Sequence, residues 1–103
     1  MGIKVLNKDS LLGIISSNKD AIRRYGVKTL GLFGSFSRNK QTDESDVDLL
    51  VDFEPGKETY KNFIGLAYFM EELLGRKVEL ITRNGMSPYI GPKILKEVED
   101  VPL

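Results

Sequence analysis

The sequence predicts one small α/β (α+β) domain in which a β-sheet carries helices on one face. Its 103 residues, 1–103, are enough for a single domain. Segments with apolar residues at helical spacing alternate with short apolar segments typical of strands. In one strand segment, Val47 to Phe53, every odd position is apolar and the even positions are partly acidic. This pattern predicts one face against helices and one face that carries the chemistry.

Composition narrows the chemistry before any motif is considered. Lys plus Arg equals Asp plus Glu at 15 each, so the chain lacks the broad positive field that holds a nucleic-acid backbone. We therefore expect no non-specific nucleic-acid binding and no processive polymerase. The chain has no Cys and no His. A metal site must then use oxygen ligands, and a general base must be a carboxylate, Lys or Tyr.

Nothing in the sequence points to a membrane or to export. We find no apolar run long enough to cross a bilayer and no signal-peptide pattern. The absence of Cys is consistent with a reducing compartment. We expect a soluble, cytoplasmic protein, and the sequence leaves open whether it forms a homo-oligomer.

The first half of the chain predicts a helix followed by a buried strand. The helix starts at Asp9 or Ser10, and Gly26 offers its stop. The polar residues 16–18 weaken its middle and predict a kink there. Val27 to Phe33 reads as a short buried strand that ends at Gly34.

The second half predicts a helix, a strand and a short tail. Thr59 caps a helix from Tyr60 to Leu74, and Gly75 ends it. Lys77 to Thr82 alternates as a strand. The tail from Pro88 predicts an amphipathic helical turn or two. The helix has an apolar stripe that we assign to the core, made of Phe63, Ile64, Ala67, Met70, Leu73 and Leu74. We also interpret three tyrosines as packing residues, namely Tyr60, Tyr68 and Tyr89.

The stretch from Gly34 to Asp48 predicts a phosphate-binding turn beside a metal site. A Gly-Ser turn between a strand and a helix start lets backbone N–H groups point at phosphate oxygens. Asp46 and Asp48 share a face of the strand, with Cα atoms roughly 7 Å apart. Two carboxylates that close repel each other, and Mg²⁺ is the divalent ion best suited to hold them with phosphate oxygens. Taken singly, a Gly-Ser turn is usually a helix cap and an Asp-x-Asp pair a solvated strand edge. Their order along the chain favours the joint interpretation.

These residues carry a family resemblance. Gly34, Ser35 and Arg38 match a Gly-Ser-x-[Ser/Ala]-Arg motif, and residues 45–49 read Ser-Asp-Val-Asp-Leu. The chain resembles the nucleotidyltransferase superfamily typified by DNA polymerase beta, and within it the minimal, MNT-type antitoxins of HEPN/MNT pairs. The resemblance spans residues 27–83 and implies the nucleotidyltransferase fold, a small mixed sheet with helices on one face. It places Glu79 at the third family carboxylate, where Asp is more common.

The resemblance also implies roles for the residues. Asp46 and Asp48 would hold two Mg²⁺ ions, or one shared with the nucleotide. Gly34 and Ser35 would bind the β- and γ-phosphates of ATP, and Arg38 would neutralise charge on the leaving pyrophosphate. For Glu79 two roles stay open, because it would either complete the metal site or take the proton of the acceptor hydroxyl.

The acceptor implied by the resemblance is a protein. MNT antitoxins transfer AMP from ATP to a tyrosine of their cognate HEPN ribonuclease toxin and so neutralise it. A sheet face with Leu50 and Ile81 beside the acids fits a partner surface better than a free small molecule. Two alternatives remain: an antitoxin that only occludes its toxin, and a small-molecule transferase of the aminoglycoside-modifying type, which the lack of a second domain disfavours.

Overall fold

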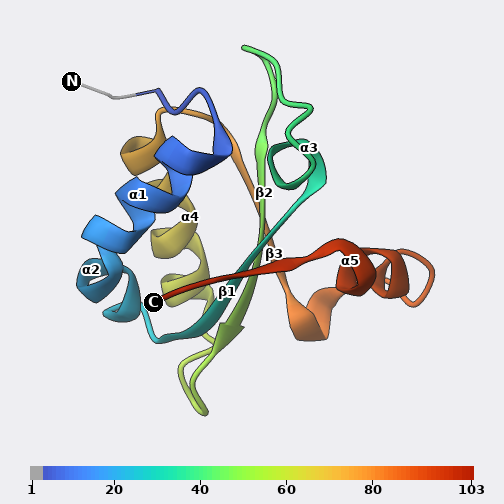
Figure 1. Cartoon of the computed structure of the whole chain (residues 1–103). Helices are drawn as coiled ribbons and strands as arrows, with labels where there is room; N and C mark the ends of the chain where they lie inside the picture. Colours follow the sequence, from blue (N-terminus) through green and yellow to red (C-terminus); the bar gives the residue numbers. More distant parts are fainter. Residues whose placement is uncertain (1–3) are drawn as a thin grey trace.

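The computed structural model describes residues 4–103 as a four-stranded sheet with helices packed on it (Figure 1). The mixed α/β class predicted from the sequence is confirmed. Along the described residues the elements follow in this order: α1 (Lys8–Ser17), α2 (Lys19–Arg23), β1 (Val27–Phe33), α3 (Gly34–Ser37), β2 (Val47–Phe53), α4 (Tyr60–Leu74), β3 (Val78–Thr82), the 3-10 helix η1 (Arg83–Gly85), α5 (Gly91–Glu97) and β4 (Glu99–Val101).

The sheet has the strand order β3-β2-β1-β4 and is mixed. β1 pairs antiparallel with both β2 and β4, and β2 pairs parallel with β3 through the α4 crossover. The two central strands are the most apolar ones because neighbouring strands and both faces of the sheet exclude water from them. Both central strands match the predicted bounds, residues 27–33 and 47–53.

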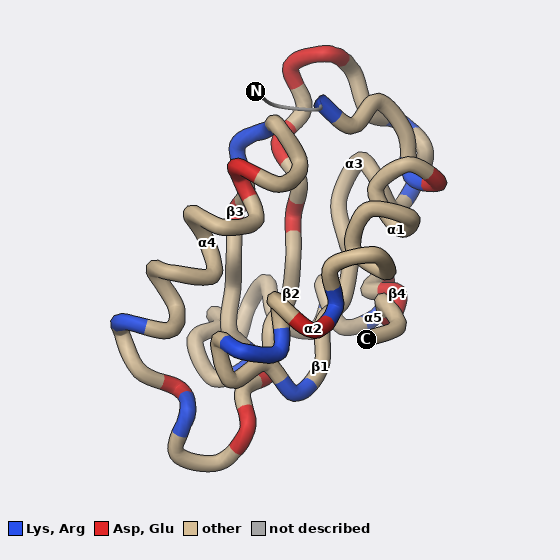
Figure 2. The backbone as a smooth tube through the Cα atoms, turned by 90° about the vertical axis from the view of Figure 1, so that its left-hand side faces the viewer, with Lys and Arg blue, Asp and Glu red and all other residues tan. Residues whose placement is uncertain are grey.

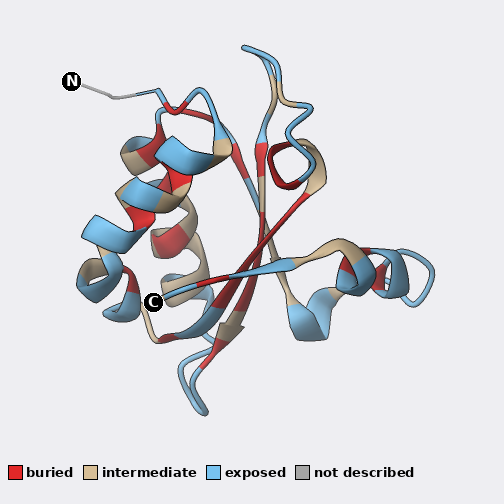
Figure 3. Ribbon diagram, viewed as in Figure 1, coloured by how far each residue is buried: buried red, intermediate tan, exposed pale blue. Residues whose placement is uncertain are grey.

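Helices α1, α2 and α4 cover one face of the sheet and form the main core with it (Figures 1 and 3). All four odd positions of β2 face this core and are at most 6 % exposed, as the alternation in the sequence predicts. The core is therefore one helix layer against one sheet face. The odd positions of β2 that belong to this core are Val47, Leu49, Val51 and Phe53.

The predicted kink in the first helix is a complete break. The Asn7 side chain caps α1 by accepting a hydrogen bond from the Ser10 backbone N–H, so the helix begins earlier than expected. α1 ends at Ser17, and Asn18 separates it from the single turn and a half of α2. The Asn18 side chain donates to the Ile14 carbonyl, one of the carbonyl groups that the end of α1 leaves without a partner in the helix.

Helix α4 has the predicted bounds and caps. The Thr59 hydroxyl accepts from the Asn62 backbone N–H, and Gly75 ends the helix in the left-handed conformation with φ +68°. The stripe differs from the prediction, since Leu66 is fully buried and Phe69 packs against the main core, and the sequence interpretation had left both out. Ile64, a predicted member, is only half-buried. The interpretation of three tyrosines as packing residues is wrong, because Tyr60, Tyr68 and Tyr89 are 80, 68 and 87 % exposed.

The tail forms the second face of the molecule. α5 lies on the side of the sheet opposite α1 and α4 (Figure 1), and its Ile94 forms a small cluster with Phe33 and Leu50. β4 then pairs with β1 and completes the sheet, a strand that the sequence interpretation missed. The expected open apolar face is therefore wrong for Leu50, which is only 3 % exposed beneath α5.

Candidate active site at one end of the sheet

The Gly-Ser turn forms directly where β1 ends. Gly34 has φ +77°, a left-handed conformation that side chains rarely adopt, and it turns the chain from β1 into the single helical turn α3. Ser35 and Ser37 follow in that turn, and Ser37 is buried. The short helix is thus positioned by a glycine whose conformation, and not only its size, is required.

The acidic residues meet at the same end of the sheet. Asp48 sits on β2 between Phe33 of β1 and Glu79 of β3, each being its direct partner in the register. Adjacent strands are about 5 Å apart, so Asp48 and Glu79 have neighbouring Cα atoms and their side chains are attached side by side. Asp46 lies just before β2 and is exposed, as is Glu79. Figure 2 shows the acidic positions at the starts of β2 and β3 at one end of the molecule.

The environment of Asp48 raises the pKa of its carboxyl group. Its pKa rises from 3.8 to about 6, first because partial burial disfavours the charged form and then because Glu79 and Asp46 add negative charge. Glu97 adds to this effect, and Arg38 opposes it. Burial and neighbouring negative charge both disfavour the ionised form of Asp48, so a cation bound beside it would stabilise that form.

Gly34 and Asp48 are in direct contact. A Cβ built on Gly34 would lie 2.0 Å from the Asp48 Oδ2 atom, far inside the distance that two such atoms tolerate. The backbone of the turn therefore reaches the acid at a distance that only glycine allows. This contact joins the predicted phosphate turn and the predicted metal site into one site.

A carboxylate from the tail also enters this site. The Gly34 backbone N–H donates to the Glu97 Oε1 atom at 3.1 Å, and the Arg38 guanidinium donates to both carboxylate oxygens of Glu97 at 3.1 and 3.2 Å. Glu97 was not among the residues expected from the sequence. Its only signal there is a charged position in the amphipathic tail, which does not reveal that α5 folds back onto the Gly-Ser turn.

Buried polar contacts hold the site from behind. Arg76, 6 % exposed, donates from Nη1 to the carbonyls of Thr42, Asp43 and Ser45, in the loop that leads to Asp46. Its guanidinium also lies 4.9 Å from the centre of the Phe36 ring in α3. One cation therefore ties the acidic loop to the phosphate turn.

A second set of contacts ties α3 to the sheet edge and to α1. The Ser37 hydroxyl donates to Glu99 at 3.1 Å, and Glu99 accepts from Lys8 at 2.5 Å. The two hydrogen bonds, from Lys8 and then from Ser37, lower the pKa of Glu99.

The donor set fits a magnesium ion. Every candidate ligand is a carboxylate, the oxygen donor that Mg²⁺ prefers, and one or two of them suffice when the substrate supplies the rest. Within residues 4–103 no three acidic side chains are already gathered closely enough to enclose an ion by themselves.

The sequence matches a family model at residues 15–101, and that model is described as a nucleotidyltransferase domain. The chain belongs to the nucleotidyltransferase family. The match runs from the end of α1 to β4 and includes both the Gly-Ser turn and the acidic strand.

One relative and two solved structures resemble the chain over most of its length. Protein adenylyltransferase MntA of Thermococcus cleftensis is 37 % identical over 95 residues, which cover 91 % of this chain and 95 % of that protein. A solved minimal nucleotidyltransferase superposes with a TM-score of 0.79 at 30 % identity and covers 95 % of this chain and 97 % of its own. A toxin-antitoxin structure with AMP-PNP shares the fold, with a TM-score of 0.67 at 20 % identity over 94 % of this chain and 73 % of that one.

The structure thus brings together most of the residues that the sequence singled out. Asp48 contacts Gly34 and pairs with Glu79, while Ser35 and Arg38 follow in and after α3. Their chemical roles stay predictions. Sequence reasoning missed two further residues at this candidate site, Glu97 and Arg76.

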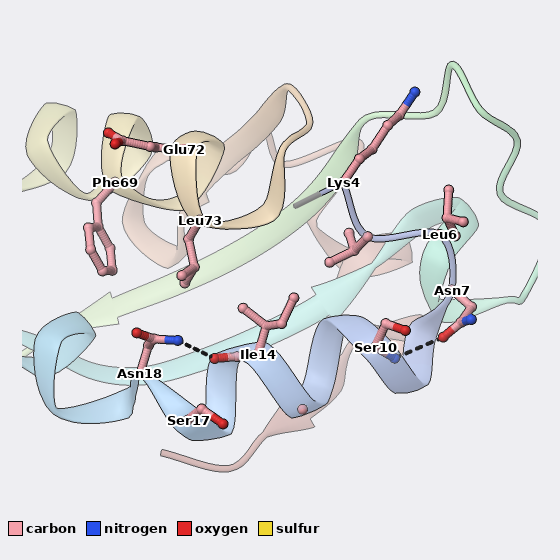
Figure 4. Close-up of a pocket in the computed structure, with 12 residues that line it drawn as sticks. Lys4, Leu6, Asn7, Ser10, Ile14, Ser17, Asn18, Phe69, Glu72 and Leu73 are labelled. Carbon is pink, nitrogen blue, oxygen red and sulfur yellow. Dashed lines mark hydrogen bonds between the residues drawn. The ribbon is translucent and has the colours of Figure 1, made fainter. Parts of the chain in front are cut away.

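A hollow in the surface lies away from this site. A groove of about 910 Å³ runs between α1 and α4 on the helical face (Figure 4), and none of the site residues lines it. Ile14 and Leu73 point into it from opposite walls, and Asn7 and Ser10 lie at one end.

No helix within residues 4–103 combines the length and the apolar character needed to cross a bilayer.

Proposed function

We propose that this nucleotidyltransferase transfers AMP from ATP to a tyrosine hydroxyl of a cognate HEPN-domain toxin and thereby neutralises it. The observation that carries the proposal is the contact of Gly34 with Asp48, which sits beside Glu79 in the parallel register. A phosphate held by the Gly-Ser turn would lie against the carboxylates.

Each residue has a role in this proposal. Asp46 and Asp48 hold the metal-bound nucleotide, and Gly34 and Ser35 donate hydrogen bonds to its phosphates. Arg38 balances the charge of the leaving group, because a guanidinium binds phosphate oxygens in two-point geometry. Bound Mg²⁺ would supply charge neutralisation at the triphosphate.

The reaction is a displacement at phosphorus. The acceptor hydroxyl oxygen forms a bond to the α-phosphorus of ATP, the bond from that phosphorus to the β-phosphate oxygen breaks, and pyrophosphate leaves. The hydroxyl proton passes to a carboxylate, for which Glu79 is exposed and next to Asp48. The product is an AMP ester of the acceptor side chain.

Two observations support a protein acceptor. Asp46 and Glu79 lie at an exposed edge, which a side chain on a folded surface can reach. The relative MntA is named a protein adenylyltransferase and matches over nearly the whole chain. These two observations support a protein as the acceptor. The proposal that this protein is a HEPN toxin and that its tyrosine is modified rests on the family resemblance.

Intact-mass spectrometry tests the proposal. The purified chain is incubated with ATP, Mg²⁺ and the toxin encoded beside it, and we expect the toxin to gain one or more AMP units. The Asp46→Asn, Asp48→Asn double variant should add none. Asp52→Asn is the matched control, because it makes the same change on the same strand away from Gly34. A toxin that is neutralised but never modified would refute transfer and leave occlusion as the function.

A further inference from the structure

Glu97 occupies the hydrogen-bond donors that the phosphates of ATP would need. It is the last residue of α5, and its carboxylate accepts from the Gly34 N–H at 3.1 Å and from the Arg38 guanidinium at 3.1 and 3.2 Å. A carboxylate offers two anionic oxygens, as a phosphate does towards the same donors. The tail thus places an anion of this chain itself at the phosphate turn.

The backbone behind Glu97 is held from two sides. One turn earlier, Ile94 is buried against Phe33 and Leu50, and directly afterwards β4 pairs with β1. The Glu97 side chain itself is 36 % exposed. The anchored helix therefore presents the carboxylate to the turn, while the side chain alone has room to turn away.

Glu97 and a phosphate cannot share the Gly34 donor. A backbone N–H has a single hydrogen to donate, so it serves either the carboxylate or a phosphate oxygen. Arg38 has further N–H groups and can bind both, but two anions side by side on the turn repel each other. A phosphate that binds at Gly34 must therefore displace Glu97 first.

We propose that Glu97 is an internal competitor of the nucleotide, which binds at the Gly34–Arg38 donors and lowers the affinity for the triphosphate of ATP. This rests on the proposed function, because it assumes that ATP binds at that turn. Glu97 in this proposal sets nucleotide affinity and takes no part in the bond exchange.

Calorimetry on the full chain tests whether Glu97 competes with the nucleotide. It measures the affinity for two ligands, ATP with Mg²⁺ and inorganic tripolyphosphate. Glu97→Gln keeps the shape of the side chain and removes its charge, and Glu97→Ala removes the contact altogether. We expect both variants to bind both ligands more tightly, by about tenfold for the alanine variant, since like-charge contacts carry costs of that order. Tripolyphosphate lacks the nucleoside, so a shared gain locates the effect at the phosphates.

Glu44→Gln is the matched control. Glu44 is exposed in the loop before Asp46, and the change removes the same charge near the site without touching Gly34 or Arg38. Its affinities should stay within about twofold of the unmodified chain, as expected for a screened surface charge. Thermal melts check that each variant is folded.

The outcomes separate the two proposals. If the unmodified chain binds ATP and the Glu97 variants bind it equally or more weakly, the competitor is refuted and the proposed function stands. Weaker binding would make Glu97 a residue that positions Arg38. If neither the chain nor its Glu97 variants bind either ligand, the proposed function fails and the competitor with it.

Discussion

At the scale of single residues, Gly34 is subject to two independent constraints. Its φ of +77° is costly for any residue with a Cβ, and the added atom would lie 2.0 Å from Asp48 Oδ2. Gly56 has the same kind of backbone, φ +78°, but open space around it. The pair therefore separates backbone strain from the clash with the acid.

We predict that Gly34→Ala lowers the free energy of unfolding by about 2–3 kcal/mol and abolishes ATP binding. Gly56→Ala should cost about 1 kcal/mol, the strain of the left-handed conformation alone, and leave ATP binding intact. Urea unfolding and calorimetry measure the two effects. Equal losses in both variants would show that the Gly34–Asp48 contact has no energetic weight.

The charge of Asp48 has a defined pH dependence. Its pKa in the folded chain is about 6, against 3.8 for the free group, so the folded state binds its proton more tightly than the unfolded state does. Stability from this group is therefore complete below pH 4 and falls as the pH rises from about 4 to about 6.

We predict that Asp48→Asn stabilises the metal-free protein above pH 6, on the order of 1 kcal/mol once screening at this half-exposed site is allowed for. Below pH 4 the difference should vanish, because Asp48 is then neutral in both states. Thermal melts in EDTA across this range, with Asp52→Asn as the control, measure it. A variant less stable than the parent at pH 8 would contradict the repulsion.

At the scale of elements, the corner between α4 and β3 determines how the loop before Asp46 is held. Arg76 is buried there and donates to four backbone carbonyls, those of Val5, Thr42, Asp43 and Ser45. Five N–H groups in a rigid plane allow this, and a lysine ammonium cannot reproduce it. The loop to Asp46 has no helix or strand, and Arg76 adds contacts to the turn that Thr42 and Ser45 form within it.

We predict that Arg76→Lys lowers the free energy of unfolding by about 1–3 kcal/mol, because buried carbonyls lose their donors. Hydrogen exchange should also speed up at the amides of residues 42–46, ahead of global unfolding. Arg83→Lys, the same change at an exposed site in η1, should alter neither. Unchanged exchange in the loop would show that Arg76 does not hold it.

At the scale of the whole molecule, two unequal cores share one sheet. The larger lies under α1, α2 and α4, and the smaller joins Phe33, Leu50 and Ile94 beneath α5. Leu49 and Leu50 are neighbours on β2 but belong to different cores. The smaller core, together with the pairing of β4 with β1, holds α5 where Glu97 reaches the Gly-Ser turn.

We predict that Leu49→Ala and Leu50→Ala each cost about 2–4 kcal/mol, since both remove buried methyl groups. Only Leu50→Ala should raise hydrogen exchange selectively in α5, residues 91–97, because its cavity lies beneath that helix. Exchange mapped by mass spectrometry compares the two variants. Equal protection of α5 in both would show that the small core does not hold it.

Local patterns explain which parts of the fold were predictable. The strands at residues 27–33 and 47–53 and the capped helix at 60–74 follow from alternation, periodicity and capping residues within each segment. The strand β4 has only three residues, and its partner on β1 lies about seventy positions earlier. Nothing local marks such an edge strand, so the sequence interpretation treated it as tail.

The sequence by itself determined the family motif and the faces of β2, because period-2 alternation and residue type act over a few neighbours. The pairing of Asp48 with Glu79 required β2 and β3 to be neighbours, which the tertiary structure decided. Only the tertiary structure decided that Glu97 meets Gly34 and Arg38, that Arg76 holds the loop before Asp46, and that Leu50 is covered. Each of these contacts joins residues more than thirty positions apart. Such contacts depend on how whole elements pack, which no short stretch of sequence encodes.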